Sequence, residues 1–171
     1  MKMTARPSLF DDELFLLAAQ LVALYRSRGL MLATAESCTG GLVAALLTEI
    51  AGSSSVVERG FVTYSNAAKQ ELLGVAPSLL ATRGAVSTEV AQAMAQGALE
   101  HSRADVAVAI TGIAGPGGGT AQKPVGLVHF ATAARNGGVT ACEKRFGDLG
   151  RAAIRRAAVL QALELLCARA H

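Results

Sequence analysis

The stretch that decides the fold is Val106-Ala107-Val108-Ala109-Ile110, an uninterrupted apolar run that leads into the glycine-rich segment 111–120. A short apolar run with β-branched residues, bounded by turn formers, is typical of a strand that is buried on both faces. Such a strand needs helices on either side of its sheet. Because helix-like and strand-like segments alternate along the rest of the chain, the sequence predicts an α/β protein with a single three-layer α/β/α domain.

Hydrophobic periodicity and turn residues place the other elements around this strand. Leucines at steps of three and four over 14–24 form one helical face, and Gly29 lies where that helix would end. Further helices are expected over 40–50, 67–73, 87–101 and 151–168, a loop around Pro77, and strands over 30–35, 56–64, 125–133 and 139–146. Asn136-Gly137-Gly138 is a hairpin signal, so the last two strands should be antiparallel and the sheet mixed.

Length and composition describe one domain with a hydrophobic core. The chain has 171 residues, of which 51% are hydrophobic and 17% charged; we expect a flexible N-terminal segment over 1–10 and the domain over 11–171. No apolar stretch reaches the roughly 18 residues of a membrane span, and no secretory signal layout is present. Three widely spaced cysteines form no CxxC pair. These features predict a reduced, cytoplasmic protein without membrane contact, disulfide framework or zinc site.

Small side chains dominate the apolar fraction. The chain has 34 alanines and 18 glycines against five Phe, two Tyr and no Trp. Small residues let helices and strands approach closely, but they offer few rings on which bases could stack, which argues against a platform for single-stranded nucleic acid. The net charge is +3, with an excess of basic residues after position 135. That excess suits nucleic acid or one small anion, and composition alone does not choose between them.

The first segment that could carry chemistry is TAESCTGG at 34–41, between a predicted strand and a predicted helix. Ligands of open α/β sheets bind at the carboxyl ends of strands, and the N–H groups that begin a helix attract anions. Ser37 or Cys38 would lie beside those donors, as a nucleophile needs, with Gly40 and Gly41 allowing close approach. The alternative is that Ser37 or Thr39 only caps the helix.

The second segment is Tyr64-Ser65-Asn66-Ala67-Ala68-Lys69, again between a strand and a helix. Lys69 is either an ordinary surface lysine or the base that takes the proton of Ser37. A lysine serves as a base only where burial or a neighbouring cation lowers its pKa. The three histidines offer no better base, because His171 is terminal, His101 ends a helix and His129 falls within a strand, where a core or sheet-face role is expected.

Two further segments could bind a ligand. The glycine-rich loop over 111–119 matches neither a Walker loop nor a GxGxxG turn, so it is either a flexible connection or a ligand loop with backbone donors and the Thr111 hydroxyl. Arg151 and Arg155, one turn apart near the start of the last helix, suit a phosphate. The alternative for both arginines is a solvated helix surface.

Five blocks in this order give the sequence a resemblance to a known family. They are TAESCTGG at 34–41, RGFVTYSN at 59–66 with Lys69, GAVS at 84–87, TGIAGP at 111–116 and KPVG at 123–126. Over about residues 12–168 the chain resembles the CinA C-terminal domain family. The resemblance implies a three-layer fold on a mixed sheet and hydrolysis of the carboxamide of nicotinamide mononucleotide, which yields nicotinate mononucleotide and ammonia without a metal or cofactor.

The resemblance also implies roles for individual residues. The nucleophile falls on Ser37 and the general base on Lys69, with Tyr64 close by. The positions around the substrate fall on Thr39, Gly40, Gly41, Thr111, Gly112, Gly115 and Arg151. The family's Gly-Asp-Arg reads GDLGR at 147–151 here, so Arg155 is the reserve for binding the phosphate. Backbone N–H groups around 39–41 would bind the oxyanion.

The expected partner is therefore a small nucleotide substrate, rather than nucleic acid or a membrane, and a homo-oligomer, preferably a dimer, is expected. A rival interpretation is a non-catalytic nucleotide-binding or interaction domain linked to competence or DNA damage, which would bind a nucleotide without releasing ammonia. A third interpretation makes Cys38 the nucleophile, although the sequence offers no paired histidine.

Overall fold

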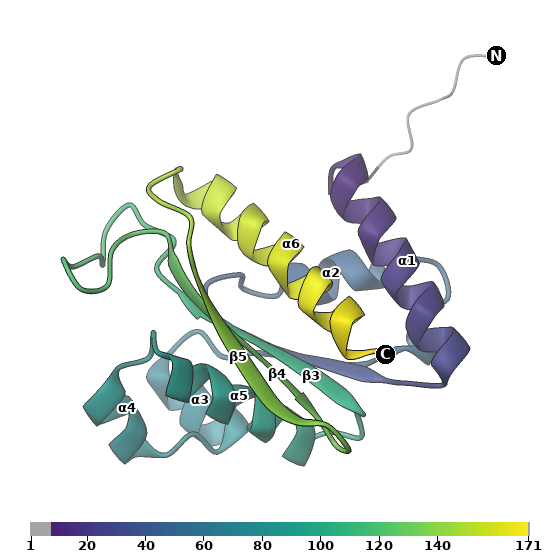
Figure 1. Ribbon diagram of the computed structural model, residues 1–171, viewed down its shortest axis with the longest axis horizontal. Helices are drawn as coiled ribbons and strands as arrows, with labels where there is room; N and C mark the ends of the chain where they lie inside the picture. The colour runs from purple at the N-terminus through teal and green to yellow at the C-terminus, as the bar shows by residue number, and fades with distance from the viewer. Residues whose placement is uncertain (1–7, 171) are drawn as a thin grey trace.

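A five-stranded mixed sheet forms the middle layer of the molecule in a computed structural model that describes residues 8–170 (Figure 1). The strands are β1 (Leu32–Glu36), β2 (Val57–Val62), β3 (Val106–Gly112), β4 (Leu127–Ala134) and β5 (Gly138–Arg145), in the order β2-β1-β3-β4-β5. β1 pairs in parallel with β2 and β3, while the β3–β4 and β4–β5 pairs are antiparallel. The predicted mixed sheet and hairpin are confirmed. Most of the expected flexible segment over 1–10, and His171, lie outside the described residues.

Six α-helices cover the two faces of the sheet, so the predicted three layers are confirmed. They are α1 (Asp12–Arg28), α2 (Leu42–Thr48), α3 (Asn66–Leu73), α4 (Pro77–Arg83), α5 (Thr88–Glu100) and α6 (Arg151–Arg169), with a short 3-10 helix over Ser53–Ser55. α1, α2 and α6 lie on one face, and α3, α4 and α5 lie on the other (Figure 1). No described helix has the length and apolar character needed to cross a membrane.

One sequence expectation, the loop around Pro77, is wrong. Residues Pro77–Arg83 form helix α4, and Pro77 occupies its first turn. Proline is well suited to that position, because the first N–H groups of a helix have no partner within the helix and the proline ring already holds a helical φ. The expectation of a loop treats proline only as a signal for a connection between elements, although proline also begins helices.

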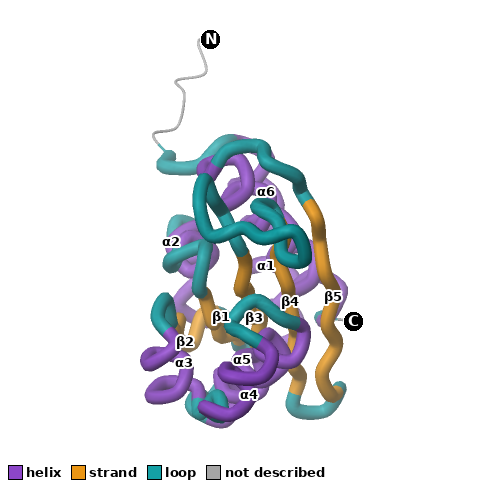
Figure 2. Tube along the Cα trace, turned by 90° about the vertical axis from the view of Figure 1, so that its left-hand side faces the viewer, coloured by secondary structure: helices purple, strands orange, loops and turns teal. Residues whose placement is uncertain are grey.

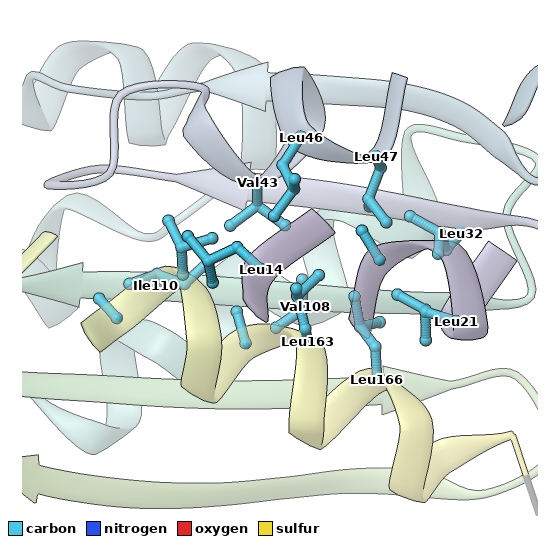
Figure 3. Packing of buried hydrophobic residues seen from close by; sticks show 14 of the residues in the cluster. Leu14, Leu21, Leu32, Val43, Leu46, Leu47, Val108, Ile110, Leu163 and Leu166 are labelled. Atoms are coloured by element: carbon cyan, nitrogen blue, oxygen red, sulfur yellow. The ribbon is translucent and has the colours of Figure 1, made fainter. Parts of the chain in front are cut away.

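The two faces of the sheet are packed with side chains of different size. Between the sheet and α1, α2 and α6 lie large aliphatic side chains such as Leu21, Leu46 and Leu163 from the helices and Ile110 from β3 (Figure 3). Against α5 the strands present alanines, and α5 answers with small residues of its own. The alanines of this face are Ala33, Ala35, Ala107, Ala109, Ala131 and Ala133 from the strands, and Ala91, Ala95 and Ala98 from α5. The excess of alanine in the composition therefore brings α5 close to the sheet.

The parallel strands bring three chain segments to one end of the sheet. The carboxyl ends of β1, β2 and β3 point the same way, so the segments that follow Glu36, Val62 and Gly112 leave the sheet at one edge. The long loop between β3 and β4 rises at this end (Figure 2). Crevices at the carboxyl ends of parallel strands are the usual binding sites of open α/β sheets.

Close packing of α3 against α5 depends on Gly97. A Cβ atom at this position would collide with the carbonyl group of Leu73, at the end of the helix that carries Lys69. We expect Gly97→Ala to lower the free energy of unfolding by at least about 1–3 kcal/mol, because backbone must move to make room. Urea denaturation measures the change. Gln96→Ala, at an exposed position of the same helix, should leave stability nearly unchanged; equal stability of both variants would contradict this packing.

Candidate active site

A cavity of about 210 Å³ lies where these segments meet, and its lining residues come from the end of β3, from connections between elements and from the first turns of α3 and α6. Its lining consists of Ser37, Cys38, Tyr64, Lys69, Ala85, Val86, Thr111, Gly112, Ala114 and Arg151. Of the residues singled out in the sequence, it thus brings together Ser37, Tyr64, Lys69, Thr111, Gly112 and Arg151. Thr39, Gly40, Gly41 and Gly115 are not part of this lining.

Lys69 and Ser37 are in direct contact. The Nζ atom of Lys69 lies 2.9 Å from the Oγ atom of Ser37, 2.7 Å from the carbonyl oxygen of Thr63 and 3.4 Å from that of Tyr64. The Ser65 hydroxyl accepts from the Ala68 N–H and so starts helix α3. Lys69 follows in the first turn, and its side chain reaches from α3 to the residue after β1.

The lysine is buried and has no acidic partner. Its relative exposure is 1%, and none of the ion pairs within residues 8–170 involves it. Burial lowers the pKa of the Lys69 amine below its ordinary value of 10.5, because a charged group is poorly solvated there. In the neutral amine, two N–H bonds can point to the carbonyls of Thr63 and Tyr64. The nitrogen lone pair then faces the hydroxyl of Ser37.

Glu36 is a buried residue of the site that sequence reasoning missed. Its carboxylate is fully buried and accepts hydrogen bonds from three backbone N–H groups at the start of α2. Those of Gly41 and Val43 reach one oxygen at 3.1 Å each, and that of Ala44 reaches the other at 3.0 Å. The signal was present in the sequence: an acidic residue ends a wholly buried strand, directly before a helix whose N-cap, Gly41, has no side chain to cap it.

The expected roles of the TAESCTGG segment are therefore corrected in part. Neither Ser37 nor Thr39 caps α2, since the N–H groups of Gly41, Val43 and Ala44 at its start donate to Glu36 instead. The N–H of Gly40 donates to the Ser37 carbonyl and that of Gly41 to Glu36, so neither is free for an oxyanion. In the part of the chain that the structure describes, no carbonyl or carboxylate oxygen accepts from the N–H of Cys38 or Thr39.

Cys38 is unsuited to act as the nucleophile. Burial raises the pKa of its thiol to about 11, opposing the smaller effect of its own backbone N–H. A thiol with that pKa stays protonated near neutral pH, and the thiolate is the reactive form of cysteine. No histidine lines the cavity beside it. The interpretation that placed the nucleophile on Cys38 thus loses its support.

Tyr64 and Arg151 meet at the edge of the cavity. The Tyr64 side chain is 61% exposed, and its hydroxyl accepts a hydrogen bond of 2.9 Å from Nη2 of Arg151. Nη1 of Arg151 donates to the carbonyl of Gly115 at 2.8 Å. The altered GDLGR sequence therefore still brings Arg151 to the site. Arg155 instead donates to the carbonyls of Cys38 and Thr39, outside the cavity lining.

Thr111, Gly112 and His129 have structural partners, whereas the buried Thr39 hydroxyl has none among the described residues. The buried Thr111 hydroxyl donates to the carbonyl of Ala85 at 2.8 Å, so its proton is already engaged. Gly112 lies so close to β4 that a Cβ atom would be 2.7 Å from a methyl group of Val128. His129 is buried on the sheet, with Nδ1 3.2 Å from the Thr88 hydroxyl, as expected of a sheet-face histidine.

A larger groove of about 440 Å³ lies elsewhere and lacks comparable chemistry. It is lined in part by Arg28, Arg135 and Arg169. The guanidinium groups of Arg135 and Arg169 are hydrogen-bonded to backbone carbonyls, such as those of Leu99, Ala104 and Gly138. These two guanidinium groups are already bound by the backbone, so the smaller cavity with the Ser37–Lys69 contact is the better candidate site.

Because the three N–H groups bound by Glu36 are shielded from solvent, replacing the carboxylate should weaken the fold. We expect Glu36→Gln to lower the free energy of unfolding by about 1–3 kcal/mol, since an amide cannot accept all three hydrogen bonds. Urea denaturation followed by circular dichroism checks this. Glu71→Gln on the exposed side of α3 is the control; a loss as large in that variant would show that Glu36 has no special role.

Comparison with known proteins shows the family of this chain. The sequence profile of the CinA C-terminal domain matches residues 15–170. The chain is 54% identical to the nicotinamide-nucleotide amidohydrolase PncC of Escherichia coli K12 over 157 residues, which are 91% of this chain and 94% of the relative. Identity to the PncC protein of Enterobacter agglomerans is 49%, over 90% and 93% of the two chains.

Solved structures give the same result. The crystal structure of the competence/damage inducible protein CihA from Agrobacterium tumefaciens superposes with a TM-score of 0.93 and 60% identity, covering 95% of this chain and 98% of the other. A CinA superfamily protein from Klebsiella pneumoniae gives a TM-score of 0.87 and 37% identity, over 92% and 97%. This chain therefore belongs to the CinA C-terminal domain family.

Proposed function

We propose that this chain is a nicotinamide-nucleotide amidohydrolase, which converts nicotinamide mononucleotide and water to nicotinate mononucleotide and ammonia. The observation that carries the proposal is the contact between Lys69 and Ser37. The buried Lys69 amine lies 2.9 Å from the Ser37 hydroxyl in a cavity, and it forms no ion pair with an acidic side chain of the described residues. A serine hydroxyl is a weak nucleophile that needs an adjacent base. The 54% identity to a relative that bears this name, over 94% of its length, supports the same substrate.

The first half of the reaction acylates the serine. Ser37 Oγ attacks the carbon of the carboxamide while its proton passes to the neutral Lys69 amine. The new C–O bond gives a tetrahedral intermediate with negative charge on the former carbonyl oxygen. The Lys69 ammonium then gives its proton to the amide nitrogen, the C–N bond breaks, and ammonia leaves. Ser37 is left as an ester of the nicotinate group.

The second half repeats the relay with water. Lys69 accepts a proton from a water molecule that attacks the ester carbon, and it returns this proton to Ser37 Oγ as the C–O bond breaks. The enzyme is then in its starting state, and the hydroxyl group of water has replaced the amino group of the carboxamide. The carbonyls of Thr63 and Tyr64 hold the lysine nitrogen in place in both halves, because they accept its remaining N–H bonds.

The oxyanion donors are assigned to the turn that follows the nucleophile. The N–H of Cys38 has no oxygen acceptor within residues 8–170, and Cys38 lines the cavity directly after Ser37. The N–H of Thr39 is the second candidate. Donors that are preorganised at the place where charge develops supply much of the rate in acyl transfer. The helix start itself is unavailable, since Glu36 accepts from its N–H groups.

The size of the cavity and its charge fit one end of the nucleotide. A volume of about 210 Å³ is smaller than the roughly 300–1,000 Å³ of pockets that enclose whole drug-sized ligands. The pyridine carboxamide would therefore enter, and the ribose phosphate would lie at the edge beside Tyr64 and Arg151. Arg151 has no carboxylate partner in the described part of the chain, so its charge is available for the phosphate.

Two sequence-based expectations about the whole protein stay predictions. They are the dimer and the location in the cytoplasm, which size-exclusion chromatography and cell fractionation address. Nothing in the described residues favours the rival, non-catalytic interaction domain, and the activity assay below distinguishes it.

Replacing either member of the Ser37–Lys69 pair should abolish turnover. We expect Ser37→Ala and Lys69→Met each to reduce kcat by about 10³-fold or more, because residues of a nucleophile–base pair act as a unit. Ammonia release from nicotinamide mononucleotide is the assay. Ser78→Ala and Lys144→Met, at exposed positions, are the matched controls. Nucleotide binding by the wild type without ammonia release would favour the non-catalytic rival.

The pH dependence should report the titration of Lys69. Because the amine accepts a proton only when neutral and burial lowers its pKa, kcat/KM should rise with pH along a limb whose midpoint lies below 10.5. Initial rates across a pH series measure this limb. Lys144→Met should leave its midpoint unchanged. A midpoint at or above 10.5 would contradict the assignment of Lys69 as the base.

A further inference from the structure

Three successive carbonyl groups next to the active site are each bound by a different side chain. They belong to the segment 83–87, here called the wall segment, which joins α4 to α5. Lys123 Nζ donates to the carbonyl of Arg83 at 2.7 Å, Ser87 Oγ to that of Gly84 at 3.0 Å, and Thr111 Oγ1 to that of Ala85 at 2.8 Å. The wall segment is thus held through side chains, since it forms no strand.

The wall segment forms part of the cavity that holds Ser37 and Lys69. Ala85 and Val86 contribute to the cavity lining, and both are apolar. An apolar wall of small side chains suits the flat face of a pyridine ring. The position of this wall therefore affects how the ring, and with it the carboxamide carbon, is held relative to Ser37.

Of the three donors, Ser87 belongs to the wall segment itself and Thr111 to β3, whereas Lys123 comes from a distant loop. It lies in the loop between β3 and β4, in a turn where the Thr120 N–H donates to the Lys123 carbonyl at 2.8 Å and the Lys123 N–H donates to the Thr120 hydroxyl at 3.0 Å. No ion pair with a carboxylate is formed by Lys123 among the described residues. Its ammonium is therefore directed at a neutral carbonyl alone.

Gly84 is matched to this lysine. Its φ angle is +75°, and a Cβ atom there would lie 3.1 Å from Lys123 Nζ. A side chain at position 84 would thus crowd the ammonium group and strain the backbone. The GAVS and KPVG blocks, which the Ser37–Lys69 chemistry leaves unexplained, meet at this contact.

We propose that Lys123 is a positioning residue for the amidohydrolase reaction, which fixes the wall segment against the pyridine ring of the substrate through the Arg83 carbonyl. The inference rests on the proposed function for its substrate. Lys123 does not touch the reacting atoms; it acts through Ala85 and Val86. An exposed lysine near a nucleotide site has one other obvious role, which is to bind the phosphate directly, and the experiment separates the two roles.

The kinetic experiment compares nicotinamide mononucleotide with nicotinamide riboside, which lacks the phosphate. Lys123→Met should raise KM for both substrates by a similar factor, roughly fivefold to tenfold, as for the loss of one hydrogen bond. Lys123→Arg, which keeps a donor, should recover part of the loss. Lys144→Met removes the same charge from an exposed site on β5 and should change neither KM.

Arg151→Met provides the contrasting pattern, because the loss of a residue that binds the phosphate should raise KM for the mononucleotide only. If Lys123→Met behaves in that way, Lys123 binds phosphate and the proposal is wrong. Unchanged KM for both substrates would overturn it as well. Thermal melting by circular dichroism confirms that the variants are folded, and Lys123→Gln replaces Lys123→Met should the latter not fold.

Amide hydrogen exchange tests the contact without using the reaction. The Gly84 N–H donates to the Leu80 carbonyl at 3.0 Å, and the Val90 N–H donates to Ser87 Oγ at 3.3 Å. Both amides should exchange faster in folded Lys123→Met than in the wild type, and unchanged exchange would contradict the proposal. If the wild type released no ammonia, the proposed function would fail, while this measurement would still decide whether Lys123 fixes the wall segment.

Discussion

The structure depends on a lysine amine that is buried without an acid beside it. A charged ammonium in such a place is poorly solvated, and among the described residues the partners of Lys69 Nζ are Ser37 Oγ and the carbonyls of Thr63 and Tyr64. These partners suit a neutral amine better than an isolated charge. The arrangement requires that α3 begin at Ser65, that β1 end beside it, and that α5 pack closely behind. A nearby carboxylate would stabilise the charged lysine and so oppose the role proposed for Lys69 as a base.

Two charged side chains near the cavity, those of Glu36 and Arg151, are each hydrogen-bonded to backbone groups. The start of α2 carries the positive end of a helix dipole and would ordinarily attract an anion. The buried carboxylate of Glu36 already accepts hydrogen bonds from these N–H groups, so they are not available to a phosphate or an oxyanion. Arg151 provides positive charge at the cavity edge instead, held by Tyr64 and Gly115. In the proposed function, the nucleotide is bound at its phosphate while the amide end enters the cavity.

The two faces of the sheet bury side chains of different size. Large aliphatic side chains under α1, α2 and α6 bury the greater apolar surface, the dominant favourable contribution to folding. The alanine-rich face under α5 buries smaller groups, but it allows the helix, the wall segment and Lys69 to approach the strand ends. The Thr111 hydroxyl and the Lys123 ammonium join this face to the long loop. The cavity thus lies at the end of the sheet, where residues from both faces contribute to its lining.

The sequence by itself determined the strands, most helices and the hairpin, and its resemblance to a family pointed to the roles proposed for Ser37, Lys69 and Arg151. These follow from local periodicity, turn chemistry and motifs, each of which lies within a few neighbouring residues. The helix at Pro77 was missed because proline both begins helices and interrupts them. Only the tertiary structure decided that Glu36 takes the helix N–H groups, that Arg151 rather than Arg155 lines the cavity, and that Lys123 reaches Arg83. Each of these depends on which buried donor meets which acceptor across the sheet, and burial is a property of packing rather than of local sequence.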